Sequence, residues 1–529
     1  MTSRRAAWAS EAMLLARNLM SHCKIRPIVL AAAAAVSCCG SLALAQDIGP
    51  STLQTPYVIP TAPGVRTISF ISNGNGTGGQ ADETYARTGG GAPYRMAGIP
   101  DGAGAYSNGD GTFTFLMTHE LGATAGVVRA HGTAGSFVSK WIINADANNL
   151  AVRSGEDLIK TNAPVAGGAA PFGRFCSADL PAVSAFRNTA TGLGTDARIF
   201  MSGEEVGSEG RLYGMPVTGA NAGTSYFLPA LGKFSWENAL ANPFMQDKTI
   251  VISTDDSTPG EVYMYVGTKT NSANPIDAAG LNNGTLYGMK TPVFSDTTAT
   301  PAIGATTFVP FNTATQTGLG SGLQTASAAA GVTQFARPED GAWDVANPTD
   351  FYFVTTGTSA APDRLYRTRL NDIANPETGA NTELLLDSAL TESMDNITVV
   401  NGRDGKTRVL MQEDPGSSSR LAKIWMFTPD TGELLEVAAH DAKFFSGTAA
   451  TNSTFLTTNE ESSGIIPVWD ILGDGWFLAD VQAHYGSTGE LVEGGQAFAI
   501  FIPQSVPEPT TIAALAASSM LALRRRRAR

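Results

Sequence analysis

The sequence predicts an all-β fold: a β-propeller of about six blades with long inserted loops. Short runs rich in Val, Ile, Phe, Tyr and Thr are bounded by Gly, Asn, Asp and Pro, as strands and turns are. No long stretch has the 3.6-residue apolar period of a helix. A paired strand motif recurs along the chain. A β-sandwich or a β-helix would also contain short strands, but neither so readily gives paired strands at blade-like intervals.

Each repeat of the motif has a first strand that ends in acid and a second strand with an aromatic residue near its centre. The first strands with acidic ends occupy 113–120, 197–205, 249–257 and 408–415. Their partners include GRLYGMPV after ARIFMSGEE and GEVYMYVGT after TIVISTDDS. A further pair, DFYFVTTG and DRLYRTRL, has Thr356 in the acidic position.

The spacing of the motif sets the expected number of repeats. The equivalent points are Glu205, Asp256, Thr356 and Asp414, which lie 51, 100 and 58 residues apart. The longest interval is interpreted as two repeats, with TLYGMKTPV at 285–293 in the second of them. Units of this length, each with several short strands, are typical of propeller blades.

Helices and loops are expected between these strands. The segments 237–244 and 275–281 are interpreted as single helical turns. Gly-, Thr- and Ala-rich stretches at 70–95, 160–172 and 296–330 are interpreted as long surface loops or insertions. No charged or Pro-rich linker divides 46–505, so we expect one β-propeller domain there.

The N-terminal segment 1–45 resembles a secretory signal. Basic residues precede the apolar run PIVLAAAAAVSCCGSLALA, which ends in small residues before Gln46. The alternative is a permanent N-terminal anchor. Export by either route places the folded part outside the cytoplasm.

The C-terminal segment 506–529 has three parts. Val-Pro-Glu-Pro is followed by an apolar stretch and then by the cluster RRRRAR. The apolar part is shorter than the roughly 20 residues that cross a bilayer as a helix, so a short apolar helix is expected. A short membrane tail is one interpretation. The order of the three parts also closely resembles the PEP-CTERM sorting signal, which an exosortase-type enzyme recognises and processes at the envelope.

Composition limits the function classes. Only Cys176 lies outside the signal segment, so the exported chain has no intramolecular disulfide. The formal net charge is −13 although both chain ends are basic, and nucleic acid is therefore excluded as an expected partner. Excess carboxylate suits solubility, and it also suits hard cations such as calcium.

In a propeller, equivalent strand ends converge on one rim of a central channel. Carboxylates gathered there would repel one another unless they were protonated or neutralised, so bound cations are expected. Neighbours in a strand point to opposite sides, so one acid of each pair enters the channel while the other braces a loop or binds a second ion. The candidate ligands from these strand ends are Glu120, Glu204, Glu205, Asp256 and Glu413. The alternative is that these acids only cap turns.

Other candidates lie outside the acidic strand ends. Arg337 and Glu339 occur in RPEDGAWD, where the arginine could contact phosphate bidentately or pair with neighbouring acids. Asp395 is an oxygen donor or a turn former. Cys176 is a soft iron ligand or a small buried hydrophobe. Glu461 is a weaker candidate. No serine-hydrolase, zinc-protease, EF-hand or phosphate-loop motif is present.

These segments resemble a known family. The runs RFCSADLPAVSAF, ARIFMSGEE, FARPEDGAWD, MDNITVV and VLMQEDPG look like the secreted PhoX-type alkaline phosphatases, and the likeness covers most of 113–445. The resemblance implies a propeller whose centre binds iron and calcium and cleaves phosphate monoesters. It implies that Cys176 and Glu205 are iron ligands and that Arg337 helps to hold phosphate. It implies iron or calcium ligands at Glu120, Glu204, Glu339, Asp395 and Glu413.

The sequence therefore predicts an exported, metal-dependent phosphatase with iron and calcium as cofactors. Its expected catalytic residues are Arg337, Glu205 and Cys176. Its expected partners are a small phosphorylated substrate and the sorting machinery, with the tail in the membrane before processing at a bacterial cell envelope, cell surface or matrix. The alternatives are a non-catalytic, calcium-stabilised surface propeller that binds a polymer or a partner, and a propeller hydrolase of the phytase or lactonase kind.

Overall fold

The computed structural model describes residues 45–74, 83–312, 320–359, 361–418 and 420–503. They belong to one compact unit, Leu44–Val506. The predicted sorting tail, its short helix and all but the last residue of the predicted signal lie outside the described residues. Strands dominate the described chain and its helices are short, which confirms the all-β class. Within the described residues, no helix combines the length and apolarity needed to span a membrane.

The first two sheets along the chain are made of short strands. The first sheet has the order β4 (Pro100–Ser107), β5 (Thr112–His119), β6 (Phe137–Asn144), β7 (Val152–Asp157). The second has the order β8 (Thr161–Asn162), β14 (Thr224–Phe227), β13 (Leu212–Pro216), β12 (Ile199–Glu204), β9 (Phe175–Asp179). A two-stranded ribbon, β10 (Arg187–Asn188) and β11 (Leu193–Gly194), lies in the loop after β9.

The middle of the chain forms one sheet of nine strands. One half contains β15 (Trp236–Ala241), β16 (Lys248–Asp255), β17 (Val262–Thr268), β18 (Thr285–Lys290) and β19 (Gly304–Phe311). The other half contains β23 (Ala380–Asp387), β22 (Arg364–Leu370), β21 (Asp350–Thr355) and β20 (Pro338–Trp343). The halves join where β19 pairs with β23. The ends β15 and β20 lie beside each other.

The interval between Asp256 and Thr356 is therefore one repeat and not two. TLYGMKTPV supplies β18, which pairs with β17 of the same half-sheet. The extra length is taken up by β19 and by α4 (Gly320–Ala330). This helix occupies part of 296–330, which is predicted to be a long surface loop or insertion. Its small residues, Gly, Ser and Ala, gave no clear apolar period.

The last two sheets combine both ends of the described chain. One has the order β2 (Val58–Pro60), β27 (Glu433–His440), β26 (Lys423–Thr428), β25 (Thr407–Glu413), β24 (Met394–Asn401). The other has the order β1 (Ala45–Ile48), β3 (Arg66–Asn73), β30 (Glu493–Phe501), β29 (Trp476–Gly486), β28 (Glu461–Pro467). Because β3 pairs with β30 along most of its length, the N-terminal strand completes the last sheet.

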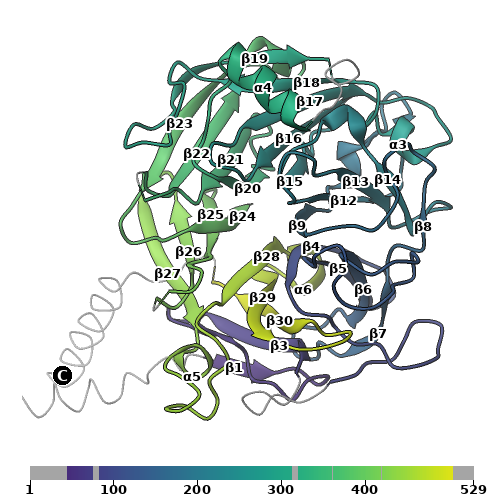
Figure 1. The fold of residues 1–529 in the computed structure, drawn as a ribbon, viewed down its shortest axis with the longest axis vertical. Coiled ribbons are helices and arrows are strands. Elements are labelled where there is room, and N and C mark those ends of the chain that lie inside the picture. Colours follow the sequence, from purple (N-terminus) through teal and green to yellow (C-terminus); the bar gives the residue numbers. More distant parts are fainter. Residues whose placement is uncertain (1–44, 75–82, 313–319, 360, 419, 504–529) are drawn as a thin grey trace, which may run out of the picture. The chain divides into compact units, whose positions relative to one another are not determined.

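Six inner strands surround a common centre, as Figure 1 shows. They are β4, β9, β15, β20, β24 and β28. Each contacts the next in this order, and β28 returns to contact β4. The strand that follows each of them in the sheet, called here the second strand, is β5, β12, β16, β21, β25 or β29.

Apolar side chains fill the spaces between neighbouring sheets. The predicted central aromatic residues, among them Trp141, Tyr213, Tyr366 and Trp425, belong to these clusters and are buried. Burial of large aromatic rings contributes strongly to stability. Successive sheets are thus held side by side, and their inner strands converge at the centre.

Short helices lie in the loops that connect the strands. The predicted turn at 275–281 contains α3 (Pro275–Ala278), where the Asn274 side chain accepts a hydrogen bond from the backbone N–H of Ile276. The other helical segments are η2 (Val183–Ala185), η3 (Pro229–Leu231), η4 (Pro376–Thr378), α5 (Ala442–Phe445) and α6 (Trp469–Leu472). The prediction of a helical turn at 237–244 is wrong, because this segment forms the inner strand β15.

Candidate metal centre

Five inner strands begin with the same irregularity, a β-bulge. In β4, for example, Asp101 and Gly102 together face the single residue Thr118 of β5. Such bulges re-aim a side chain and are common beside active sites. The first bulge residues form what we call the bulge ring: Asp101, Cys176, Glu237, Glu339 and Asp395. In the sixth inner strand, β28, the bulge falls at Gly464 and Ile465.

The bulge ring brings a thiol and carboxylates into contact. The Sγ atom of Cys176 lies 3.3 Å from Oδ2 of Asp101 and 3.0 Å from Oε2 of Glu237. Three groups each have ligand atoms within 4.8 Å of one another: Asp101–Glu120–Cys176, Glu237–Glu339–Asp395 and Asp395–Asp414–Glu461, of which the last two share Asp395. Each group offers the donor types that metal ions use in proteins.

A second ring of residues follows the ends of the second strands. These mouth residues are Glu120, Glu205, Asp256, Thr356 and Asp414. Each donates its backbone N–H to the carbonyl of the residue just before an inner strand, at 2.9–3.0 Å; the acceptors are Ile99, Arg174, Ser235, Arg337 and Ser393. The positions taken as equivalent in the sequence are therefore equivalent in space.

Adjacent acids at the strand ends have different surroundings. The Glu204 carboxylate accepts from the Arg211 guanidinium at 2.6 Å and from the backbone N–H of Gly173 at 3.0 Å. Glu413 likewise accepts from Arg420, at 2.5 Å. These acids brace the loops before β9 and β24, and both lie outside the three candidate metal groups.

Arg337 lies at the mouth between two carboxylates. Its Nε and Nη2 atoms donate to Asp256 at 2.9 and 2.8 Å, and Nη2 lies 3.0 Å from Oε1 of Glu339. The Thr356 hydroxyl donates to the same Glu339 oxygen at 2.5 Å. The structure thus brings three predicted site residues together, with Asp256 bound to arginine and outside the three groups.

A polar layer lies beside the bulge ring and fixes it. It is made of the second bulge residues Ser177, Asn238, Asp340 and Asn396. Asn238 donates to Asp340 at 2.6 Å and to Ser177 at 3.2 Å, and Asn396 donates to the same serine at 3.2 Å. Two of these hydrogen bonds join neighbouring inner strands and the third joins β24 to the non-adjacent β9. Such contacts behind the ring hold candidate ligand side chains in position.

Electrostatics favour a cation at the centre. Burial, followed by neighbouring carboxylates, raises the pKa of Asp101, Glu237 and Glu339 well above the ordinary range. Burial and the charge of Glu120 raise the pKa of Glu205 to about 8. Burial and nearby carboxylates also raise the pKa of the Cys176 thiol. A multivalent cation reverses this balance by stabilising the ionised ligands.

Two buried carboxylate oxygens of the bulge ring indicate that metal ions fit at this centre. Oδ1 of Asp101 and Oε1 of Glu237 are buried and have no hydrogen-bond partner among the described residues. Unsatisfied buried polar atoms are costly, and coordination would satisfy these two. The donor set, one thiol beside several carboxylates, fits a transition metal next to hard cations.

Asp101, Glu237 and Arg174 are not among the candidates predicted from the sequence, Asp414 is predicted only as the strand-end neighbour of Glu413, and Glu461 only as a weaker candidate. A signal for part of this set is present in the sequence. The bulge triplets PDG, FCS, WEN, PED and MDN each have an apolar residue, a ligand and a small or polar residue in that order. The triplets are too short to reveal strands by alternation, so only comparison between repeats could have exposed them.

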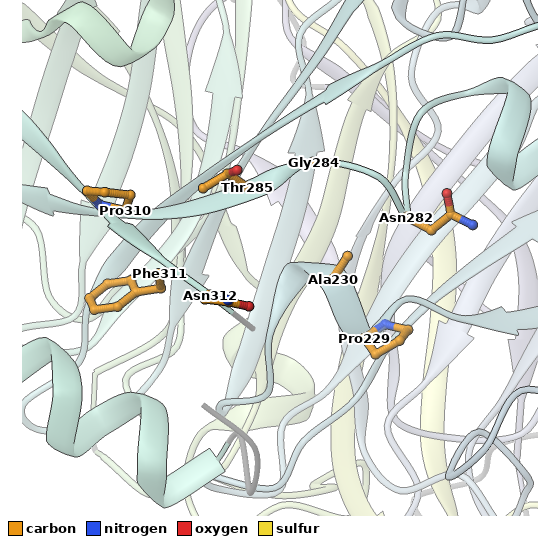
Figure 2. Close-up of a pocket in the computed structure, with 8 residues that line it drawn as sticks. All are labelled: Pro229, Ala230, Asn282, Gly284, Thr285, Pro310, Phe311 and Asn312. Atoms are coloured by element: carbon orange, nitrogen blue, oxygen red, sulfur yellow. The ribbon is translucent and has the colours of Figure 1, made fainter. Parts of the chain in front are cut away.

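A pocket of about 670 Å³ lies elsewhere, near β18, β19 and η3 (Figure 2). Its lining residues are Pro229, Ala230, Asn282, Gly284, Thr285, Pro310, Phe311 and Asn312. None of them has an ionisable side chain, and none belongs to either ring. The chemistry-bearing groups are at the centre of the sheets and not in this pocket.

The fold and the site define an all-β protein with a carboxylate- and thiol-lined centre. Residues 216–467 match the family model described as alkaline phosphatase PhoX. This match spans just under half of the chain and includes Glu237, Arg337, Glu339 and Asp395, but not Cys176. No curated protein matches the chain in sequence.

One solved structure shares the fold. Pseudomonas fluorescens PhoX, solved in complex with vanadate, a transition state analogue, is 13% identical with a TM-score of 0.55; the similarity covers 87% of this chain and 98% of that one. A protein of unknown function from Dyadobacter fermentans is 8% identical with a TM-score of 0.42, over 83% and 100% of the two chains. The family model supports a phosphoric monoester hydrolase, and the first structure supports its fold.

Proposed function

We propose that the protein is a metal-dependent phosphatase that hydrolyses phosphate monoesters at the centre of a six-bladed propeller. The main support is the bulge ring, in which Cys176 contacts two buried carboxylates, each with one oxygen that has no hydrogen-bond partner among the described residues. The six inner strands support the blade number, with the nine-stranded sheet supplying two blades. The PhoX family model and the vanadate complex of the Pseudomonas protein support the reaction.

Iron and calcium are the proposed metals. Cys176, with Asp101 and Glu120, offers the only thiol ligand among the described residues, and thiolate ligands suit iron. The other two groups, Glu237–Glu339–Asp395 and Asp395–Asp414–Glu461, contain oxygen donors alone, as calcium prefers. Bound metal ions would supply Lewis-acid polarisation of the phosphoryl group and an activated water nucleophile.

The chain's own residues bind and orient the substrate. Arg337 has a planar guanidinium, which can contact two phosphoryl oxygens and stabilise their charge as the ester bond breaks. Its side chain is 37% exposed, so a ligand can reach it. Asp256 and Glu339 hold the guanidinium in place. The ester oxygen leaves as the alcohol, and no serine-nucleophile motif is needed.

Two substitutions test this function. We expect Cys176→Ser and Glu205→Gln to abolish release of p-nitrophenol from p-nitrophenyl phosphate. The first change removes the thiol of the proposed iron group, and the second removes a carboxylate that lies outside this group but shares Arg174 with its member Glu120. Glu433→Gln, at the exposed start of β27, is the matched control and should retain wild-type activity. Full rates in both site variants would contradict the proposed iron site. Elemental analysis separates the alternatives: calcium without iron, and no phosphate release, would favour a non-catalytic binder.

Export to the cell envelope is part of the proposal. The signal-like segment 1–45 and the PEP-CTERM-like tail 506–529 support it, the tail through an exosortase-type enzyme. N-terminal sequencing and mass spectrometry of the protein from its native host test both cleavages. A protein found in the cytoplasm with both segments intact would contradict export to the cell envelope.

A further inference from the structure

Two arginines occupy matching places at the mouth of the centre. Arg174 directly precedes β9, and Arg337 directly precedes β20. Their φ angles are 39° and 58°, in the left-handed region that residues other than glycine rarely adopt. Backbone strain of this kind clusters at functional sites. Ile99 and Ser393, which directly precede β4 and β24, have φ angles of 50° and 52°, so the conformation belongs to the repeat and gives the two arginines equivalent backbone positions.

Their contacts are equivalent in part, although Arg174 also pairs with the Glu205 carboxylate and Arg337 with the Glu339 carboxylate. Each guanidinium binds the mouth residue at the end of the preceding second strand: Arg174 binds Glu120 at 2.5 Å, and Arg337 binds Asp256 at 2.8 Å. Each arginine carbonyl accepts the N–H of the next mouth residue, which is Glu205 or Thr356, at 2.9 and 3.0 Å. Arg174 is therefore the counterpart of Arg337 two inner strands earlier.

The two arginines flank neighbouring ligand groups. Arg174 binds Glu120 in the group that contains Cys176, and Arg337 binds Glu339 in the group that contains Glu237. These groups touch, because Sγ of Cys176 lies 3.0 Å from Oε2 of Glu237. The arginine side chains remain 47% and 37% exposed, so both are accessible to a ligand at the mouth.

We propose that Arg174 contacts the same phosphoryl group as Arg337, so that the two guanidinium groups clamp a dianionic phosphate monoester. This inference rests on the proposed function and adds a second phosphate-binding residue to it. A monoester dianion has three non-bridging oxygens and two charges, enough for two arginine forks. A diester has two non-bridging oxygens and one charge, so it leaves one guanidinium without its anion. Arg174 thus selects monoesters over diesters.

The test measures binding of inorganic phosphate to the metal-loaded full chain by calorimetry. We expect Arg174→Ala to raise the Kd for phosphate by about 10- to 100-fold, the effect of losing charged hydrogen bonds. Arg174→Lys keeps the positive charge but loses the planar guanidinium, so its Kd for phosphate should lie between those of Arg174→Ala and wild type. Arg66→Ala removes an arginine that is paired with Asp47 on another part of the molecule, and should bind phosphate as wild type does.

Steady-state kinetics provide a second readout. Arg174→Ala should raise KM for p-nitrophenyl phosphate and lower the preference for it over bis-p-nitrophenyl phosphate. Metal content, measured on the same samples, separates direct contact from support of Glu120 and Glu205. Unchanged phosphate affinity in the metal-loaded fraction of Arg174→Ala would overturn the clamp. If wild type itself neither binds nor releases phosphate, the proposed function fails.

Discussion

Adjacent acidic residues at one strand end make different contacts. Glu204 lies in a closed set of donors from Arg211 and the loop before β9, whereas Glu205 faces the mouth beside Arg174. The alternation of side chains along a strand separates them. The sequence was sufficient to predict that one member of each pair braces a loop. It could not show which acids already had an arginine partner, because Arg211 and Arg420 become partners only through the folded hairpins.

The different surroundings of Glu204 and Glu205 predict different effects when each is substituted. Glu204→Gln should lower the free energy of unfolding by about 2–3 kcal/mol, because it removes the carboxylate partner of a largely buried arginine. Glu205→Gln should leave stability nearly unchanged and reduce bound metal. Urea unfolding and elemental analysis measure the two effects. Loss of metal without loss of stability in Glu204→Gln would show that this carboxylate is a ligand.

At the scale of the element, the β-bulge is the unit that builds the site. In five inner strands it places two consecutive side chains in different polar layers, as with Cys176, which contacts Glu237, and Ser177, which accepts from Asn238 and Asn396. Second strands could be predicted because their apolar runs are long and end in acid. Inner strands such as β15 could not, because ENALANPF contains Asn and Pro, and its register shift breaks the alternation.

The close packing of the bulges predicts that one added methyl group, at Gly102, strongly lowers stability. A Cβ atom at Gly102 would lie 2.2 Å from the backbone nitrogen of Ala178, so Gly102→Ala should destabilise the protein by about 1–3 kcal/mol or more. It should also weaken metal binding through the adjacent Asp101. Gly122→Ala is the control, because no atom lies within 4 Å of its added Cβ. Equal melting temperatures for the two variants would contradict the close approach of β4 and β9.

At the scale of the whole molecule, stability and metal binding are linked through the buried acids. The pKa of Glu205 is about 8 instead of 4.5, first because of burial and then because of Glu120, and the pKa values of Asp101, Glu237 and Glu339 are raised as well. The folded, metal-free chain therefore binds more protons than the unfolded chain. Its stability must fall as pH rises from about 5 to about 8.

Melting curves of the protein treated with a chelator test this linkage. The melting temperature should decrease across that pH range, and saturating calcium should raise it most at pH 8, where the ligands would otherwise be charged and unpaired. Ring closure by β3 against β30 predicts one cooperative transition. A metal-free protein that becomes more stable between pH 5 and pH 8 would contradict the crowding of acids at the centre.

Element-specific anomalous scattering from crystals of the metal-loaded protein tests the central claim most directly. We expect an iron peak within about 2.5 Å of the Cys176 sulfur, and calcium density within about 2.6 Å of carboxylate oxygens of Glu339, Asp395 or Glu461. Absence of metal from all three groups, with the carboxylates hydrogen-bonded to one another or to water, would contradict it.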